Sequence, residues 1–196
     1  ASLLAEKIRE KTCKPLEVLV IREEGGSLKT VSHIVELAEG MRRKADILPL
    51  EETDISELIL GTECGGSDPT SGLVSNPVTG ICSDLLIKHG GTVILSETPE
   101  MIGAEKILAS RCKNQEVREK LLNTIKEFEE DFLRVGENPR SGNPTPGNIA
   151  GGITTLEEKS LGCIHKGGSS VIQEVVAYGE KITGKGLVVM DTPGQD

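Results

Sequence analysis

Apolar residues along the chain occur in two patterns, short continuous runs and stretches in which they recur every three or four positions. Short runs bounded by glycine or polar residues are typical of buried strands, and the wider spacing is typical of amphipathic helices. The runs predict strands at 16–21, 55–60, 92–96 and 186–190. The wider spacing predicts helices at 2–12, 27–44, 76–89, 100–110, 115–134 and 170–181.

Strands and helices alternate along the whole sequence, which favours an α/β fold with a mostly parallel sheet, of the three-layer, Rossmann-like kind. We expect one catalytic-type domain over residues 1–196, with 1–50 belonging in part to a preceding subdomain. The stretch 136–152, rich in Gly, Pro and Asn, predicts a long ordered loop, and 154–164 fits neither pattern. Because the chain opens without Met and ends just after an apolar run, we expect it to be a fragment of a longer polypeptide.

The segment 61–76, between a predicted strand and a predicted helix, concentrates residues that can do chemistry. They are a carboxylate, a thiol, two glycines, a serine and an aspartate: Glu63, Cys64, Gly65, Gly66, Ser67 and Asp68. Bare backbone N–H groups beside a helix N-terminus favour an anion, so the segment suggests catalysis on a charged small molecule. A glycine-rich turn with a buried Cys64 and an N-capping Asp68 explains the pattern equally well.

Ligands of parallel sheets bind outside the carboxyl ends of the strands. This rule gathers five residues at one edge: Glu23, Cys64, Asp68, Glu97 and Asp191. Glu97 follows a predicted strand directly, so its carboxylate is expected to point into the crevice. The alternative is a carboxylate at a helix N-terminus, stabilised by the helix dipole.

Two later segments add charged groups. Glu158 and Lys159 offer an acid, a base or a carboxylate clamp, and an exposed charged patch is the alternative. Lys166, Gly167 and Gly168 combine a cation with free N–H groups, which is a usual arrangement for binding a carboxylate or phosphate.

Composition narrows the class of protein. The formal charge of −9 and the lack of basic clusters argue against nucleic acid and anionic membrane surfaces as partners, and no apolar run is long enough to span a bilayer. Five cysteines without a Cys-x-x-Cys pair fit a reducing cytoplasm. Because no His pair has metal-ligand spacing, any metal would rest on oxygen ligands with one thiolate, which suits iron(II), manganese(II) or magnesium.

Several long motifs resemble the altronate dehydratase/galactarate dehydratase family of sugar-acid dehydratases. The longest are Glu-Cys-Gly-Gly-Ser-Asp-x-x-Ser-Gly-x-x-x-Asn-Pro at 63–77 and Gly-Asn-x-x-Gly-Gly-x-Thr-Thr-x-x-Glu-Lys-Ser-Leu-Gly at 147–162. Shorter ones are Gly-Gly-Thr-Val-Ile-Leu-Ser-Glu-Thr-Pro-Glu at 90–100, Lys-Gly-Gly at 166–168 and Met-Asp-Thr-Pro-Gly at 190–194. They look closer to the altronate branch than to the galactarate branch.

The resemblance implies a cytoplasmic hydro-lyase that dehydrates a sugar acid such as D-altronate to a 2-keto-3-deoxy acid with a divalent metal, iron(II) first and manganese(II) second. Galactarate dehydration, loss of sulfite from sulfolactate and a non-catalytic anion-binding module stay open as alternatives. The expected partner is the small-molecule substrate, and a homo-oligomer stays open. Family members commonly show Gly-Asn-Lys where this chain has Gly-Asn-Ile at 147–149, so no lysine is assigned there.

Carried onto this sequence, the resemblance implies roles for the residues named above. Metal ligands or acid–base groups are Cys64, Asp68 and Glu97, with Glu158 and Lys159 as further catalytic contributors. The substrate carboxylate is assigned to Gly65, Gly66, Ser67, Lys166, Gly167 and Gly168. The substrate hydroxyls are assigned to Asn76 and Asn148.

Overall fold

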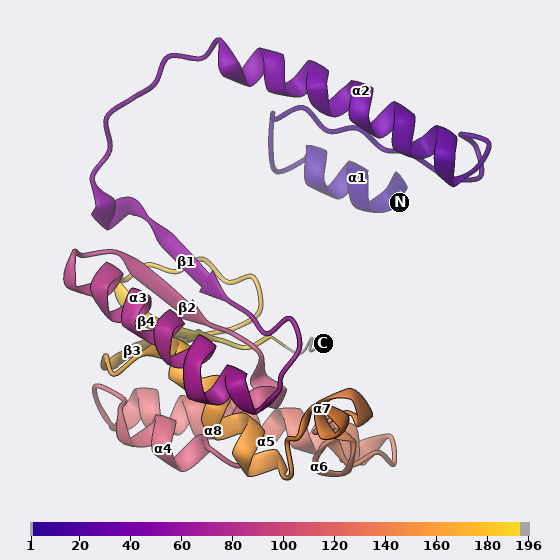
Figure 1. Ribbon diagram of the computed structural model, residues 1–196. Helices are drawn as coiled ribbons and strands as arrows, with labels where there is room; N and C mark the ends of the chain where they lie inside the picture. The colour runs from indigo at the N-terminus through magenta and orange to yellow at the C-terminus, as the bar shows by residue number, and fades with distance from the viewer. Residues whose placement is uncertain (1, 193–196) are drawn as a thin grey trace. The chain divides into compact units, whose positions relative to one another are not determined.

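The computed structural model of the chain describes residues 2–192. The chain divides into two compact units, Ala1–Glu52 and Thr53–Asp196, and each is described by itself (Figure 1). The assignment of 1–196 to one catalytic-type domain, with 1–50 partly in a preceding subdomain, stays a prediction.

The N-terminal unit contains two helices, α1 (Ser2–Arg9) and α2 (Ser27–Asp46), which agree with the helical spacing of the sequence. The strand predicted at 16–21 does not form, and this prediction was wrong. The run has no neighbouring strand in its unit, and the carbonyl of Val20 accepts hydrogen bonds from the backbone N–H groups of Glu23 and Glu24, at 2.8 and 3.0 Å. Glu23 therefore lies in a turn instead of at a sheet edge.

The C-terminal unit is built on a four-stranded sheet in the order β1-β2-β4-β3 (Figure 1). The strands are β1 (Ile59–Thr62), β2 (Thr92–Leu95), β3 (Ile172–Val176) and β4 (Gly186–Met190). All three neighbouring pairs are parallel, so the prediction of an α/β fold with a parallel sheet is confirmed.

Strand β3 replaces a predicted helix at 170–181. The segment is rich in β-branched residues, which pack well on a pleated surface, and Ile172, Val175 and Val176 are buried there. Pairing with β4 therefore outweighs the helical spacing of the sequence. After β3 the chain forms a turn at 177–180, a stretch that the predicted helix had included. The helix prediction was wrong.

Helices surround the sheet of the C-terminal unit. They are α3 (Asn76–Lys88), α4 (Glu105–Ser110), α5 (Gln115–Arg134), α6 (Pro139–Gly142), α7 (Pro146–Gly151) and α8 (Leu156–Ile164). Short turns are the 3-10 helices η1 (Ile55–Glu57), η3 (Thr98–Met101) and η4 (His165–Gly167), and the π-helical turn η2 (Ser71–Ser75). The core joins apolar side chains of the central strands to those of α5, including Leu121 and Ile125.

Three segments of the C-terminal unit differ from the elements expected for them or were left without an assignment. The helix expected at 100–110 is split into η3 and α4, because Gly103 adopts φ 92° between them. The loop expected at 136–152 is ordered and holds α6 and α7, and the unassigned 154–164 contains α8. No helix within residues 2–192 combines the length and apolar character needed to cross a bilayer.

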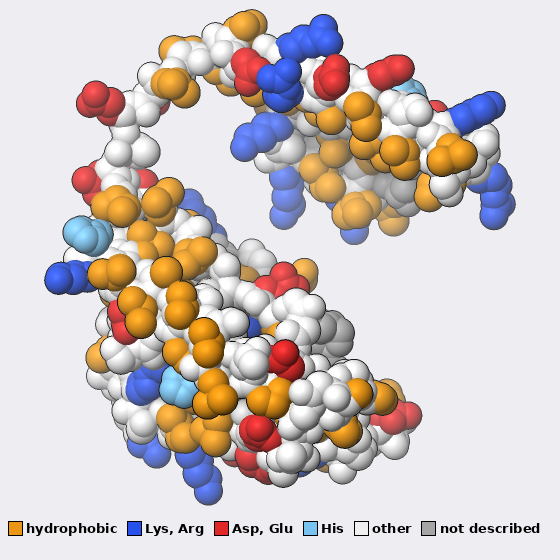
Figure 2. Space-filling model, in the orientation of Figure 1, with side chains coloured by type: hydrophobic (Ala, Val, Ile, Leu, Met, Phe, Trp, Pro, Cys, Tyr) orange, Lys and Arg blue, Asp and Glu red, His pale blue; other side chains and the backbone are white. Residues whose placement is uncertain are grey.

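Strand β1 lies at one edge of the sheet, and Ile59 is 61% exposed there. The outer side of the neighbouring α3 is also apolar and open, with Val78, Ile81 and Leu85 more than half exposed. Figure 2 shows hydrophobic side chains gathered over this part of the C-terminal unit. We call these four residues the β1–α3 face.

Candidate active site

The loop after β1 is shaped by Asp68. Its Oδ1 accepts hydrogen bonds from Thr70 Oγ1 at 2.6 Å and from the backbone N–H of Ser71 at 3.0 Å, which starts the helical turn η2. These bonds hold the pKa of the Asp68 carboxyl below its usual value, so the exposed side chain is ionised at neutral pH. Within the same loop, Cys64 Sγ and Ser67 Oγ lie 2.8 Å apart.

Helix α8 begins with a second capping arrangement. Thr155 Oγ1 accepts a hydrogen bond from the Glu158 backbone N–H at 3.1 Å, and the Glu158 carboxylate accepts from the backbone N–H and hydroxyl of Thr154 at 2.8 and 2.6 Å. The bonds from Thr154 lower the pKa of Glu158. This carboxylate is therefore also ionised at neutral pH.

Two glycines let α8 approach η2 closely. A Cβ added to Gly162 would lie 3.0 Å from Gly72 Cα, which is tighter than normal packing allows. Asn76 Nδ2 donates a hydrogen bond to the Gly162 carbonyl at 3.0 Å and ties the two segments together. The predicted substrate-binding Asn76 thus has a structural bond here.

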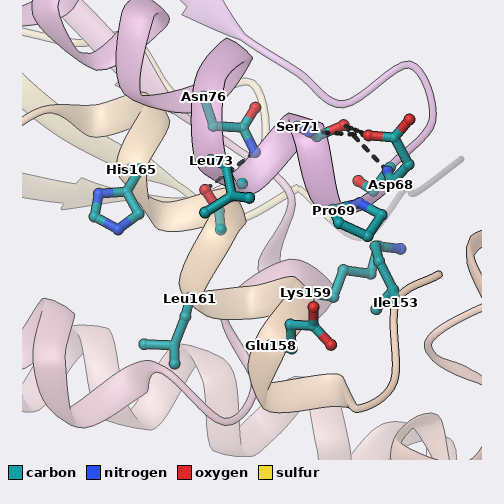
Figure 3. A pocket seen from close by; sticks show the side chains of 13 residues that line it. Asp68, Pro69, Ser71, Leu73, Asn76, Ile153, Glu158, Lys159, Leu161 and His165 are labelled. Atoms are coloured by element: carbon teal, nitrogen blue, oxygen red, sulfur yellow. Dashed lines mark hydrogen bonds between the residues drawn. The ribbon is translucent and has the colours of Figure 1, made fainter.

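A cavity of about 200 Å³ lies between these two segments (Figure 3). It is lined by Ser67, Asp68, Pro69, Ser71, Gly72, Leu73, Asn76, Ile153, Glu158, Lys159, Leu161, Gly162 and His165. All of them except His165 come from the two longest motifs of the sequence, 63–77 and 147–162. The structure thus brings together three predicted catalytic residues, Asp68, Glu158 and Lys159.

An adjoining hollow shares Ser67 and Asp68 with the cavity and is lined further by Gly66, Thr145, Gly147, Asn148 and Gly151. Asn148 Nδ2 donates to the Ser67 carbonyl at 3.0 Å, and its Oδ1 accepts from the Thr145 backbone N–H at 3.0 Å. Asn148 therefore joins α7 to the loop after β1. Gly65 lies exposed in that loop.

Glu97, by contrast, does not line the cavity. It lies between β2 and η3 with φ 72°, which is a left-handed conformation that costs a residue with a side chain about 1–3 kcal/mol. Its side chain is 3% exposed and accepts hydrogen bonds from Lys166 Nζ at 2.5 Å and from the Cys64 backbone N–H at 2.9 Å. The Glu97–Lys166 ion pair therefore holds the loop after β1 in place through the Cys64 N–H. The Glu97 carboxylate does not point into the open crevice that the sequence had predicted.

The protonation behaviour of this pair follows from its burial. Burial raises the pKa of Glu97, and the contacts with Lys166 and the Cys64 N–H oppose the rise only in part. Burial lowers the pKa of Lys166, but Cys163 and Glu97 together raise it above its usual value, so Lys166 carries its charge. Burial also raises the pKa of Cys163, whose Sγ lies 3.9 Å from Glu97 Oε2, to about 12. Cys163 is therefore a neutral thiol.

The anion cradle predicted at 166–168 is filled by the chain itself. Asp84 accepts hydrogen bonds from the backbone N–H and hydroxyl groups of Ser169 and Ser170, at 2.5–3.0 Å. A Cβ on Gly168 would lie 2.5 Å from the Asp84 carboxylate, so this glycine is needed for close packing. The Gly168 N–H, which was expected to bind a substrate carboxylate, donates instead to the His165 carbonyl at 3.0 Å, and the next two N–H groups along the loop donate to Asp84.

Sequence reasoning missed a second buried ion pair, in which Lys159 Nζ donates to Glu100 Oε1 at 2.8 Å and to Asn143 Oδ1 at 2.9 Å. One signal was available. Lys159, Cys163 and Lys166 are spaced by four and three, so they share one face of the α8–η4 segment. A polar face with this spacing on a buried helix indicates partners inside the protein.

The predicted metal ligands Cys64, Asp68 and Glu97 do not form a group of three in the structure. Among residues 2–192, no three His, Cys, Asp or Glu side chains form a group that could hold a metal ion. Glu97 is engaged by Lys166, and Asp68 is engaged by Thr70 and Ser71. The residues as placed do not fit a three-ligand site, and dependence on iron(II) or manganese(II) stays a prediction.

Asp191 does reach the sheet edge, where its Oδ1 accepts a hydrogen bond from Thr98 Oγ1 at 2.6 Å. It therefore joins the end of β4 to η3, directly after Glu97. Pro193 and Gly194, which complete the last motif, lie outside the described residues.

Comparison with known proteins agrees with the motifs. The family model described as D-galactarate/altronate dehydratase, C-terminal, matches residues 55–196, which is nearly the whole C-terminal unit. Altronate dehydratase of Escherichia coli (strain K12) is 45% identical over 166 residues, which make up 85% of this chain and 32% of that protein. Altronate dehydratase of Bacillus subtilis (strain 168) is 42% identical over 192 residues, 97% of this chain and 37% of that protein.

A third relative has another activity in its name. The (2R)-sulfolactate sulfo-lyase subunit beta of Chromohalobacter salexigens is 38% identical over 183 residues, 92% of this chain and 47% of that subunit. The chain thus spans about a third to a half of the length of these relatives. The motifs, the cavity that they line and the match over 55–196 lead to one conclusion: the chain belongs to the D-galactarate/altronate dehydratase family.

Proposed function

We propose that this chain acts as a hydro-lyase that dehydrates a sugar acid, with D-altronate as the first candidate, to a 2-keto-3-deoxy acid. The observation that carries the proposal is the cavity between η2 and α8, because both long family motifs, far apart in the sequence, line it. Two of the relatives are altronate dehydratases.

The reaction removes a proton from C2 and expels the C3 hydroxyl as water, and the resulting enol tautomerises to the 2-keto acid. A base must therefore take the C2 proton and an acid must protonate the leaving hydroxyl. The cavity holds groups for both steps: the ionised carboxylates of Asp68 and Glu158 can accept a proton, and His165 can donate or accept one.

Glu97 and Lys166 have a positioning role in this proposal. The Glu97 carboxylate holds the backbone N–H of Cys64, and Lys166 holds the carboxylate. Together they fix the loop that carries Ser67 and Asp68 into the cavity wall. The described residues present no group of three metal-capable side chains, so the proposal assigns no step to a divalent metal.

The test is a substrate comparison on the chain with D-altronate, galactarate and (2R)-sulfolactate. Formation of a 2-keto-3-deoxy acid from altronate alone supports the proposal. Turnover of galactarate alone, or release of sulfite from sulfolactate, assigns the chain to another branch of the family. A folded chain that binds these acids without turnover supports the anion-binding alternative.

A further inference from the structure

The environment of Lys159 contains two polar atoms that lack partners. Glu100 Oε1 and Asn143 Oδ1 both accept hydrogen bonds from Lys159 Nζ. The second polar atom of each side chain, Glu100 Oε2 and Asn143 Nδ2, has no hydrogen-bond partner within the described part of the chain. Glu100 is 1% exposed and Asn143 is 5% exposed. We call Glu100, Asn143 and Lys159 the buried polar triad.

Glu100 Oε2 and Asn143 Nδ2 each need a hydrogen-bond partner. A buried polar group without a hydrogen bond destabilises the fold by about 1–3 kcal/mol, so native proteins rarely leave such groups unpaired. Glu100 Oε2 belongs to the carboxylate, and Asn143 Nδ2 to the amide group, whose other atom accepts a hydrogen bond from Lys159 Nζ. Both unpartnered atoms therefore belong to groups that contact the same ammonium group.

The two atoms differ in character, and this difference selects the occupant. Glu100 Oε2 is an acceptor on a carboxylate paired with Lys159, and Asn143 Nδ2 is a donor. A hydroxyl group can donate to the first atom and accept from the second at the same time. A carboxylate has no proton to give to Glu100, and an ammonium group has no lone pair for Asn143.

The triad also lies at the right place. Lys159 is one of the residues lining the cavity between η2 and α8, and Figure 3 shows its side chain running toward the wall formed by Pro69 and Ile153. Asn143 lies shortly before Thr145, which lines the adjoining hollow. Glu100 and Asn143 line neither hollow, so Lys159, which contacts both of them, is the member of the triad that reaches the wall of the proposed substrate cavity.

We propose that the buried polar triad binds one hydroxyl group of the sugar acid and so discriminates between a polyhydroxy acid and an analogue that lacks this hydroxyl. The proposal rests on the proposed function and assigns Glu100 and Asn143 to substrate specificity. The competing occupant is a single buried water molecule, which has the same donor and acceptor capacity.

Two substitutions exchange donor and acceptor without changing side-chain size. Glu100→Gln converts the free acceptor into a donor, and Asn143→Asp converts the free donor into an acceptor. The double variant Glu100→Gln/Asn143→Asp restores one of each and keeps a single carboxylate beside Lys159. Glu157→Gln, an exposed position on α8, is the matched control for loss of a carboxylate.

The measurement is calorimetric binding of D-altronate and of hexonates that each lack one hydroxyl, with thermal unfolding as the check on folding. We expect the wild-type chain and Glu157→Gln to bind altronate about 10–100-fold more tightly than one of the deoxy acids. Each single variant should lose most of this ratio, and the double variant should regain it.

The contrary results are distinguishable. If folded variants bind altronate and the deoxy acids with the wild-type ratio, the triad holds only water and the inference fails, while the proposed function stands. If the folded wild-type chain binds no sugar acid at all, the proposed function fails and the inference fails with it.

Discussion

Lys166 Nζ lies 2.5 Å from Glu97 Oε2, and both side chains are almost completely buried below the loop that follows β1. The pair joins the end of β2 to η4, which are 69 residues apart in the chain. Because the Cys64 N–H donates to the other oxygen of Glu97, the same carboxylate also fixes the position of the loop that lines the candidate active site.

Removing one member of this pair should destabilise the C-terminal unit strongly. Lys166→Met leaves the Glu97 carboxylate buried without its cation, and we expect the free energy of unfolding to fall by about 3–5 kcal/mol in a denaturant titration. The double variant Lys166→Met/Glu97→Gln should recover most of the loss, since neither charge remains. A single variant within about 1 kcal/mol of wild type would show that the pair contributes little.

Asp84 should make stability depend on acid pH. Burial raises the pKa of the Asp84 carboxyl, but the hydrogen bonds from Ser169 and Ser170 lower it by more. The pKa in the folded protein is therefore below the ordinary value of 3.8. Its stabilisation is fully present above 3.8, the unfolded value, and is lost as pH falls through the lower folded pKa. We expect Asp84→Asn to lower stability at neutral pH by about 1.5–3 kcal/mol and to flatten the decline below pH 4. Equal slopes of unfolding free energy against pH in both proteins would contradict this.

Gly168→Ala should be destabilising because of packing and not because of ligand binding. Its Cβ would lie 2.5 Å from Asp84 and 2.6 Å from the Gly80 carbonyl, and its φ of 60° disfavours a side chain. We expect a loss of about 1–3 kcal/mol. Gly65→Ala is the control for stability, because its Cβ would meet no atom within 4 Å. Similar melting temperatures for both variants would refute the packing argument.

Glu158→Gln should impair turnover more than binding. The ionised carboxylate lines the cavity and is a candidate proton acceptor, so we expect kcat for the sugar acid to fall about 10²–10⁴-fold. Glu157→Gln, its exposed neighbour, serves as the control. Normal kcat in Glu158→Gln would remove this residue from proton transfer and leave Asp68 and His165 as candidates.

A divalent metal should strengthen binding of the substrate. The cavity presents the carboxylates of Asp68 and Glu158 to an acid that is itself negatively charged, and added positive charge offsets this repulsion. We expect D-altronate to bind at least about tenfold more tightly with iron(II) or manganese(II) in anaerobic calorimetry. Equal affinity with and without either metal would argue against the predicted cofactor.

The local spacing of apolar residues predicted correctly those helices and strands whose structure depends on a single apolar face. Helix α5 matches its expected range of 115–134, and β4 matches 186–190, because each has a clear period and clear ends. The segments 16–21 and 170–181 were assigned wrongly because their structure depends on the presence or absence of a partner strand. No local period contains that information.

The sequence predicted which segments form the candidate site, but it did not predict which of their side chains bond to one another. Asp68, Glu158 and Lys159 lie around one cavity, as their motifs suggested, because these motifs form contiguous walls. The pairing of Glu97 with Lys166, and the occupation of the Ser169–Ser170 N–H groups by Asp84, join residues 69 to 86 positions apart. Both depend on how α8 and α3 pack, which spacing along the sequence does not determine.

The β1–α3 face has a consequence for how this protein behaves at high concentration. Within residues 2–192, β1 has a partner strand on one side only, and exposed edge strands with apolar side chains template further pairing between molecules. We therefore expect reversible self-association that grows with concentration in analytical ultracentrifugation. The substitution Ile59→Lys, at the edge of the sheet, should keep the protein monomeric at concentrations where the parent chain self-associates.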